Sequence, residues 1–172
     1  MDYKSILIDF PSGREKNFLI EDVGDSEGKF HNLLKLSLYE KDPVAWRAGW
    51  ILDGCDEAHP GLASKHLSTI VQGLSGLESK GALRSLLRLL SRHDIGEADQ
   101  GMLIDLCFGY LVSALYPVAV KVHAMQIIYN HVLLYPDLKE ELVTVIQEQI
   151  NNNSVAFLSR GRHIIARLEK IQ

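Results

Sequence analysis

An internal repeat constrains this chain more than any other feature. Residues 43–47 (Pro-Val-Ala-Trp-Arg) recur 74 positions later as residues 117–121 (Pro-Val-Ala-Val-Lys). Half of that offset carries Arg47 onto Arg84, where residues 82–84 again give a small residue, an apolar residue and a cation. Arg160 follows Lys121 at a similar interval. A period of about 40 residues is typical of proteins built from repeated helix pairs.

Apolar residues recur at helical spacing along almost the whole chain after residue 25, and sustained strand-like alternation is absent. Ser12 and Glu15 form a capping box ahead of an early helix. The pattern predicts ten helices, at 2–9, 13–23, 27–40, 43–57, 61–74, 79–92, 97–113, 117–134, 137–150 and 154–170. The short connections favour antiparallel neighbours.

The predicted helices group into four two-helix units, at 27–57, 61–92, 97–134 and 137–170. One helix pair cannot bury its own apolar face, so such units stack and cover one another. We therefore expect an all-α fold in one domain over residues 1–172. Residues 1–25 would form an N-terminal helical cap, and residues 26–172 the repeats.

Composition narrows the class of protein further. The formal net charge is −4, with 47% apolar and 23% charged residues, as in ordinary globular chains. Cys55 and Cys107 lie in apolar helical patterns, which favours free buried thiols in a reducing cytoplasm. The chain start lacks the layout of a secretory signal, and no apolar run reaches the roughly 18 residues of a membrane span. We expect a cytoplasmic location, no membrane partner and no tight nonspecific binding to nucleic acid.

Residues 42–52 resemble the second helix of a HEAT repeat, with an Asp-Pro start, an apolar–Arg pair and then small and Leu positions. Residues 116–127 resemble the same element without the Asp. Over about 27–170 the chain is similar to a group of small bacterial HEAT/armadillo-like proteins. The likeness is carried by residues 46–48, 105–108, 118–121, 135–142 and 159–162. The resemblance implies a right-handed α-α superhelix of about four helix pairs whose second helices line a concave surface, and it implies no reaction.

Charge differs between first and second helices in the C-terminal half. Residues 79–92 carry four cations and no acid, and residues 153–172 have a net charge of +3. Residues 93–107 and 136–150 have net charges of −4 and −3. We therefore expect a non-enzymatic interaction module whose second helices bind an acidic protein or peptide. The candidate partner-binding residues are Arg84, Arg88, Arg92, Lys121, Arg160 and Arg162.

These cations also have more ordinary interpretations. The repeated cations could tie neighbouring repeats together through Asp–Arg bonds; they are Arg47, Arg84, Lys121 and Arg160. The remaining cations could form a solvated face; they are Lys80, Arg88, Arg92 and Arg162. Residues 42–57 have a net charge of −3, which argues against a basic track along the whole concave surface.

A second hypothesis starts from Trp46, Trp50 and Asp53, which share one helical face. HEAT-like alkylation-repair glycosylases use aromatic residues and an acid in a basic groove, where an extruded base could stack beside a carboxylate. This resemblance would make the chain a DNA-binding relative. In the ordinary interpretation both tryptophans pack between repeats and Asp53 faces solvent.

The sequence predicts no metal centre and no cofactor. Residues Cys55, Asp56, Glu57 and His59 could supply zinc ligands, but no second Cys/His pair at ligand spacing accompanies them. An ordinary polar turn is the favoured interpretation. The glycines do not follow the spacing of a phosphate-binding loop, and no Gly-x-Ser-x-Gly segment is present.

Overall fold

The computed structural model describes residues 1–9, 13–150 and 153–171, and every regular element within these ranges is helical. The all-α prediction is therefore confirmed. The chain forms two compact units, Met1–Ile95 and Gly96–Gln172. The first contains α1 (Tyr3–Ile8), α2 (Gly13–Val23), α3 (Glu27–Tyr39), α4 (Val44–Ala58), α5 (Leu67–Gly73) and α6 (Lys80–Leu90). The second contains α7 (Glu97–Val112), α8 (Val118–Val132), α9 (Leu138–Gln149) and α10 (Val155–Leu168).

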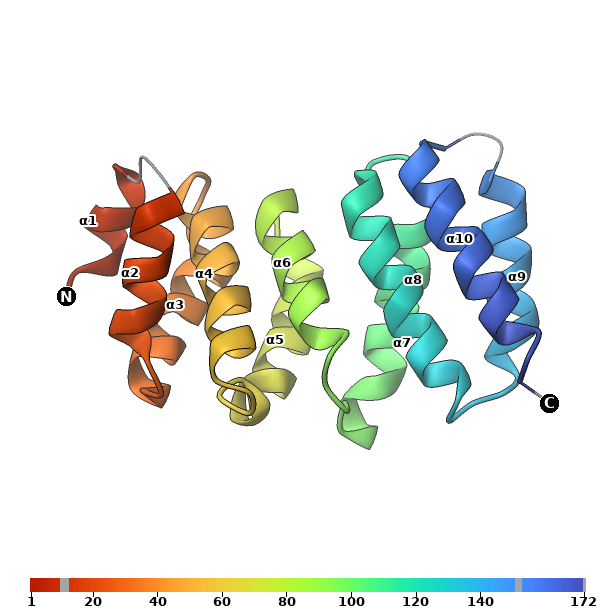
Figure 1. The fold of residues 1–172 in the computed structure, drawn as a ribbon, viewed down its shortest axis with the longest axis horizontal. Helices are drawn as coiled ribbons and strands as arrows, with labels where there is room; N and C mark the ends of the chain where they lie inside the picture. Colours follow the sequence, from red (N-terminus) through yellow and green to blue (C-terminus); the bar gives the residue numbers. More distant parts are fainter. Residues whose placement is uncertain (10–12, 151–152, 172) are drawn as a thin grey trace. The chain divides into compact units, whose positions relative to one another are not determined.

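In the first unit, the second helix of each pair lies beside the second helix of the next. Helix α4 contacts both α2 and α6, while α3 and α5 pack behind them (Figure 1). Glycines permit the close approach of α4 to α6. A Cβ on Gly49 would lie 3.1 Å from the Cα of Ala82, and a Cβ on Gly81 would lie 2.6 Å from the Cβ of Trp46.

The N-terminal helices pack onto this stack as a further helix pair. The Tyr3 hydroxyl donates to Asp22 at 2.5 Å and joins α1 to α2. The Arg47 guanidinium donates to the carbonyls of Leu7 and Ile8, at 2.7 and 2.9 Å, and so joins α4 to the end of α1. The expected capping box at Ser12 lies outside the described residues, and the division into a 1–25 cap and 26–172 repeats stays a prediction.

The expected single helix over 61–74 is wrong. A 3-10 turn at Ser64–His66 precedes α5, and a second one at Leu74–Gly76 follows it. Gly61 has a φ of 97°, outside the helical range, which delays the start of the helix. At the other end, a Cβ on Gly73 would lie 2.7 Å from a methyl group of Leu38. The glycine thus lets α5 approach α3.

His66, the last residue of the 3-10 turn, packs against α3. Its ring stacks on Phe30 and on His31, with centroids 5.4 Å apart in both cases. It is 8% exposed, and its Nε2 atom has no hydrogen-bond partner among the described residues. Burial lowers the pKa of His66 below its usual 6.5.

The pH dependence of stability should report this burial. Below about pH 6.5 the unfolded chain binds a proton at His66, whereas the folded chain keeps this histidine neutral. The free energy of unfolding therefore decreases as the pH is lowered, until the pH falls below the pKa of His66 in the folded state. The His66→Phe variant should show a smaller fall between about pH 7 and pH 5 in urea unfolding. The exposed control His163→Gln should behave like the wild type. An unchanged pH profile in His66→Phe would contradict this account.

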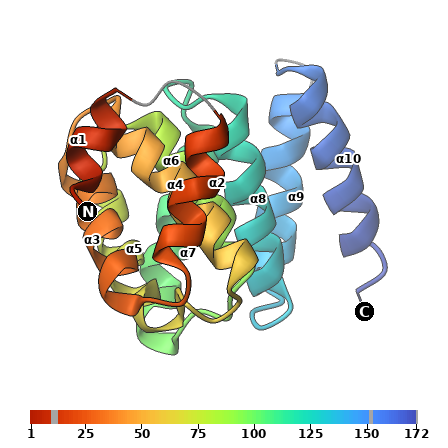
Figure 2. The same ribbon diagram turned by 60° about the vertical axis from the view of Figure 1, so that its left-hand side comes forward.

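The second unit repeats the two-layer arrangement. Helices α8 and α10 lie side by side in one layer, and α7 and α9 form the other (Figures 1 and 2). Phe157 anchors α10 and Ile146 anchors α9, and both are fully buried. The repeat prediction is confirmed by the placement of its four aligned cations, which all lie on second helices. They are Arg47 on α4, Arg84 on α6, Lys121 on α8 and Arg160 on α10.

Candidate functional site

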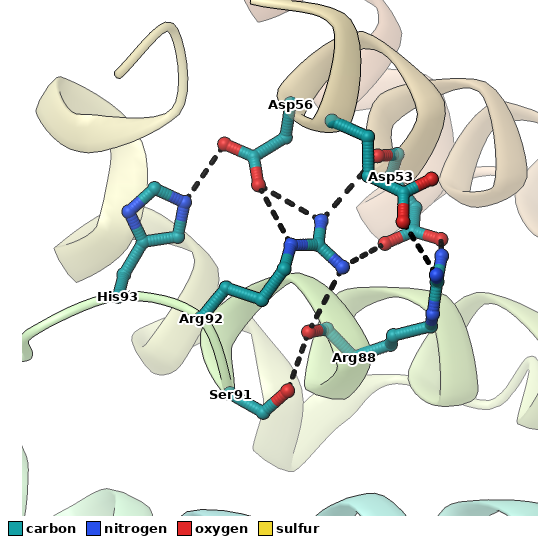
Figure 3. Close-up of polar contacts among 7 residues, drawn as sticks. Asp53, Asp56, Arg88, Ser91, Arg92 and His93 are labelled. Atoms are coloured by element: carbon teal, nitrogen blue, oxygen red, sulfur yellow. Dashed lines mark hydrogen bonds and ion pairs between the residues drawn. The ribbon is translucent and has the colours of Figure 1, made fainter. Parts of the chain in front are cut away.

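Two of the six candidate cations belong to an ion cluster between the ends of α4 and α6 (Figure 3). We call it the α4–α6 ion network; it comprises Asp53, Asp56, Glu57, Arg88, Arg92 and His93. Arg92 binds Asp53 and Asp56, each at 2.8 Å. Arg88 binds Asp53 and, at 2.5 Å, Glu57. The His93 Nε2 atom lies 2.7 Å from Asp56.

Because its carboxylates are buried, this network holds α4 and the end of α6 together. The side chains of Asp53 and Asp56 are only 5% and 2% exposed, so their charges depend on the arginines for compensation. The hydrogen bond from Arg88 lowers the pKa of Glu57, and the same bond raises the pKa of Arg88. The expectation that Asp53 faces solvent is therefore wrong. Asp–Arg bonds between repeats do exist, but Arg88 and Arg92 make them.

The aligned cations have different surroundings. The side chain of Arg84 is exposed and makes no hydrogen bond or ion pair with the described residues. Lys121 is 5% exposed, and its ammonium donates to the Gln149 amide oxygen at 3.0 Å. Desolvation lowers the pKa of Lys121. The ammonium group lies between α8 and α9. It can therefore attract a ligand at the surface electrostatically but cannot contact it.

A second group of cations lies on α8 and α10, and we call this face the α8–α10 surface. Neither helix contains Asp or Glu, whereas α7 and α9 each carry three. The cations with exposed or half-buried side chains are Arg160, Arg162 and Arg167 on α10, and Lys121 on α8 is buried. Its basic character follows from the sequence alone, and α10 packs directly against α8.

An open pocket of about 530 Å³ lies between these two helices. It is lined by Val122, Ala156, Ser159, Arg160 and His163. The guanidinium of Arg160 is half-buried and donates to the Gln126 side chain at 3.4 Å, which leaves further donors for a ligand. His163 is exposed beside it, whereas Arg162 is exposed on the same helix but does not line the pocket. The sequence patterns gave no indication of His163, because an isolated histidine has no motif.

The aromatic residues of the second hypothesis lie together on α4. The rings of Trp46 and Trp50 are 6.1 Å apart and both are half-buried. Cations lie over each ring: Arg47 at 5.4 Å from Trp46 and Lys16 at 4.6 Å from Trp50. The carboxylate of Asp53 points to Arg88 and Arg92 in the ion network. A sugar cation would have to compete with both guanidinium groups for it.

The cysteines and the acidic turn contain no assembled metal site. Cys55 and Cys107 are free and fully buried, and burial raises the pKa of Cys55 to about 12. In the ranges that the structure describes, no three His, Cys, Asp or Glu side chains are grouped to hold a metal ion. Asp56 is engaged by Arg92 and His93.

The family model described as a HEAT repeat domain matches residues 7–168. The chain therefore belongs to the HEAT repeat family. No curated protein and no solved structure matches it. HEAT repeats are generally non-enzymatic and serve as protein-interaction scaffolds, which is the class of function that the family indicates. No described helix is long and apolar enough to cross a membrane.

Proposed function

We propose that this protein is an interaction scaffold whose α8–α10 surface binds an acidic segment of a partner protein. The observation that carries the proposal is the absence of carboxylates on two adjacent helices that present Arg160 and Arg162. The pocket between these helices combines the Arg160 guanidinium with the small apolar side chains of Val122 and Ala156. Such a site suits a carboxylate on a short aliphatic stem.

The first unit contributes less to this function. The charges of Arg88 and Arg92 are compensated by buried carboxylates, so an acidic partner gains little from them. Arg84 remains as an exposed cation on α6. We therefore assign the primary contacts to Arg160 and Arg162 and a supporting field to Lys121.

The proposal involves binding without a reaction. The alternative, a DNA-binding relative of the repair glycosylases, needs an accessible carboxylate beside Trp46 and Trp50. The engagement of Asp53 by two arginines gives that alternative no support. A duplex DNA that displaced an acidic peptide from the protein would favour a polyanion site instead.

Fluorescence anisotropy with a labelled peptide rich in Glu and Asp tests the proposal. The double variant Arg160→Glu/Arg162→Glu should weaken binding by at least about tenfold, because two attractive charges become repulsive. Higher salt should weaken the binding of the wild type. A lysine-rich peptide of the same length should not bind this surface.

Arg84→Glu is the matched control, since Arg84 is an exposed cation on a second helix of the other unit. It should retain nearly the affinity of the wild type. Arg88 and Arg92 are unsuitable for this comparison because their reversal would disrupt the ion network. Equal affinities for the wild type and the double variant would refute the proposed surface.

A further inference from the structure

The other layer of the second unit contains an apolar pocket of about 360 Å³. Helix α7 forms one wall, and the turn between α8 and α9 forms the other. The lining residues are Gly101, Ile104, Asp105, Tyr135, Asp137 and Leu138. This pocket is separate from the α8–α10 surface in its residues and opposite to it in charge.

The pocket is held open by fixed walls. The Tyr135 hydroxyl donates to the Gln100 side chain at 2.5 Å, which holds the ring beside α7. The backbone amide of Leu138 donates to the Tyr135 carbonyl at 3.1 Å, which closes the turn on the opposite side. A ligand would therefore meet an open apolar groove in which the Tyr135 ring is already held by a hydrogen bond.

Gly101 leaves this pocket open on the α7 side. Glycine is unfavourable inside a helix, so an interior glycine usually has a packing reason. Gly81 and Gly161 have such reasons, because a Cβ would lie within 3.0 Å of Trp46 and of Ile146 respectively. No described atom lies within 4 Å of a Cβ built on Gly101. Gly109 on the same helix is equally open, but only Gly101 lines the pocket, where its missing side chain leaves the space unfilled.

The surroundings of the pocket define the chemistry of its occupant. Asp105 and Asp137 line it, and α7 contains three acids and no Lys or Arg. Leu133 and Leu134, 58% and 61% exposed, precede Tyr135 in the chain. An apolar cavity with an acidic rim is complementary to a bulky apolar side chain flanked by cations.

We infer that this pocket, which we call the α7 pocket, is a second docking site and takes a partner segment with one bulky apolar residue flanked by Lys or Arg. The protein then has two docking surfaces of opposite charge on the two layers of one unit. The α8–α10 surface would bind an acidic segment, and the α7 pocket a basic one with an apolar anchor. The second site does not depend on the first.

A fluorescein-labelled peptide with a central tryptophan flanked by lysines is the probe. The Gly101→Leu variant should bind it at least about tenfold more weakly, because the new side chain fills the cavity. Replacing the tryptophan with serine, or the lysines with glutamates, should abolish binding. Arg160→Glu/Arg162→Glu should leave the binding of this peptide unchanged, which separates the two sites.

Gly109→Leu is the matched control. Gly109 also lies on α7, is exposed, has no described atom within 4 Å of its Cβ position and does not line the pocket. It should bind the peptide as the wild type does. Unchanged binding in Gly101→Leu, or equal binding of the glutamate peptide, would overturn the inference. So would a wild type that ignores the peptide but self-associates through this site, seen as dimers in sedimentation velocity that Gly101→Leu abolishes.

Discussion

Replacing Arg92 with methionine should lower the free energy of unfolding by about 2–3 kcal/mol. The Arg92 guanidinium binds Asp53 and Asp56, whose side chains are 5% and 2% exposed. Methionine preserves most of the aliphatic packing but leaves both carboxylates with one fewer cation in a poorly solvated place. The loss stays below that of a fully buried pair because Arg88 still binds Asp53 and the Arg92 side chain is 30% exposed. Urea unfolding monitored by circular dichroism measures the effect.

Arg84→Met is the control for this prediction. Arg84 lies on α6, the helix that Arg92 follows. Its side chain is exposed and has no ion-pair partner in the described part of the chain. Its replacement should change stability by no more than about 0.5 kcal/mol. If both variants unfold alike, the ion network does not tie α4 to α6.

Gly81→Ala should destabilise the protein by about 1–2 kcal/mol, although alanine is the better helix former. The added Cβ would lie 2.6 Å from the Cβ of Trp46, an atom fixed to the α4 backbone. Either α6 must move away from α4 or Trp46 must shift. The same urea unfolding experiment gives the magnitude, and tryptophan fluorescence reports the movement of Trp46.

Gly101→Ala should, in contrast, stabilise the protein. Since no described atom lies near its Cβ position, the substitution should raise stability by about 0.5–1 kcal/mol through helix propensity alone. A stabilising effect in both variants would mean that α4 and α6 are not in close contact at Gly81.

The repeat and most helix boundaries were predictable because each follows from local signals. The apolar spacing and Pro43 located α4 to within one residue at each end. Ser79 and Ser154, whose side chains cap α6 and α10, are the first residues of the predicted helices 79–92 and 154–170 and stand one residue before the observed starts. The helix over 61–74 failed at its start, because the positive φ of Gly61 and the 3-10 turn at Ser64–His66 are features that periodicity does not register.

The roles of individual cations were less predictable. Repeat alignment placed Arg47 and Lys121 in equivalent helices, but their partners differ because each meets a different neighbour. Arg47 meets the carbonyl end of α1, and Lys121 meets Gln149. Asp56 and Arg92 are 36 residues apart, close to one repeat period, so an acid on α4 faces a cation that directly follows α6. That spacing was a usable signal for the ion network.

The most direct test of the α8–α10 surface is an NMR titration of the ¹⁵N-labelled protein with the acidic peptide. We expect the largest amide shift changes on α8 and α10, at Val122, Ser159, Arg160 and His163. We also expect them to disappear in Arg160→Glu/Arg162→Glu. Shift changes centred on α7 and α9, or on α4 around Trp46 and Trp50, would contradict the proposed surface.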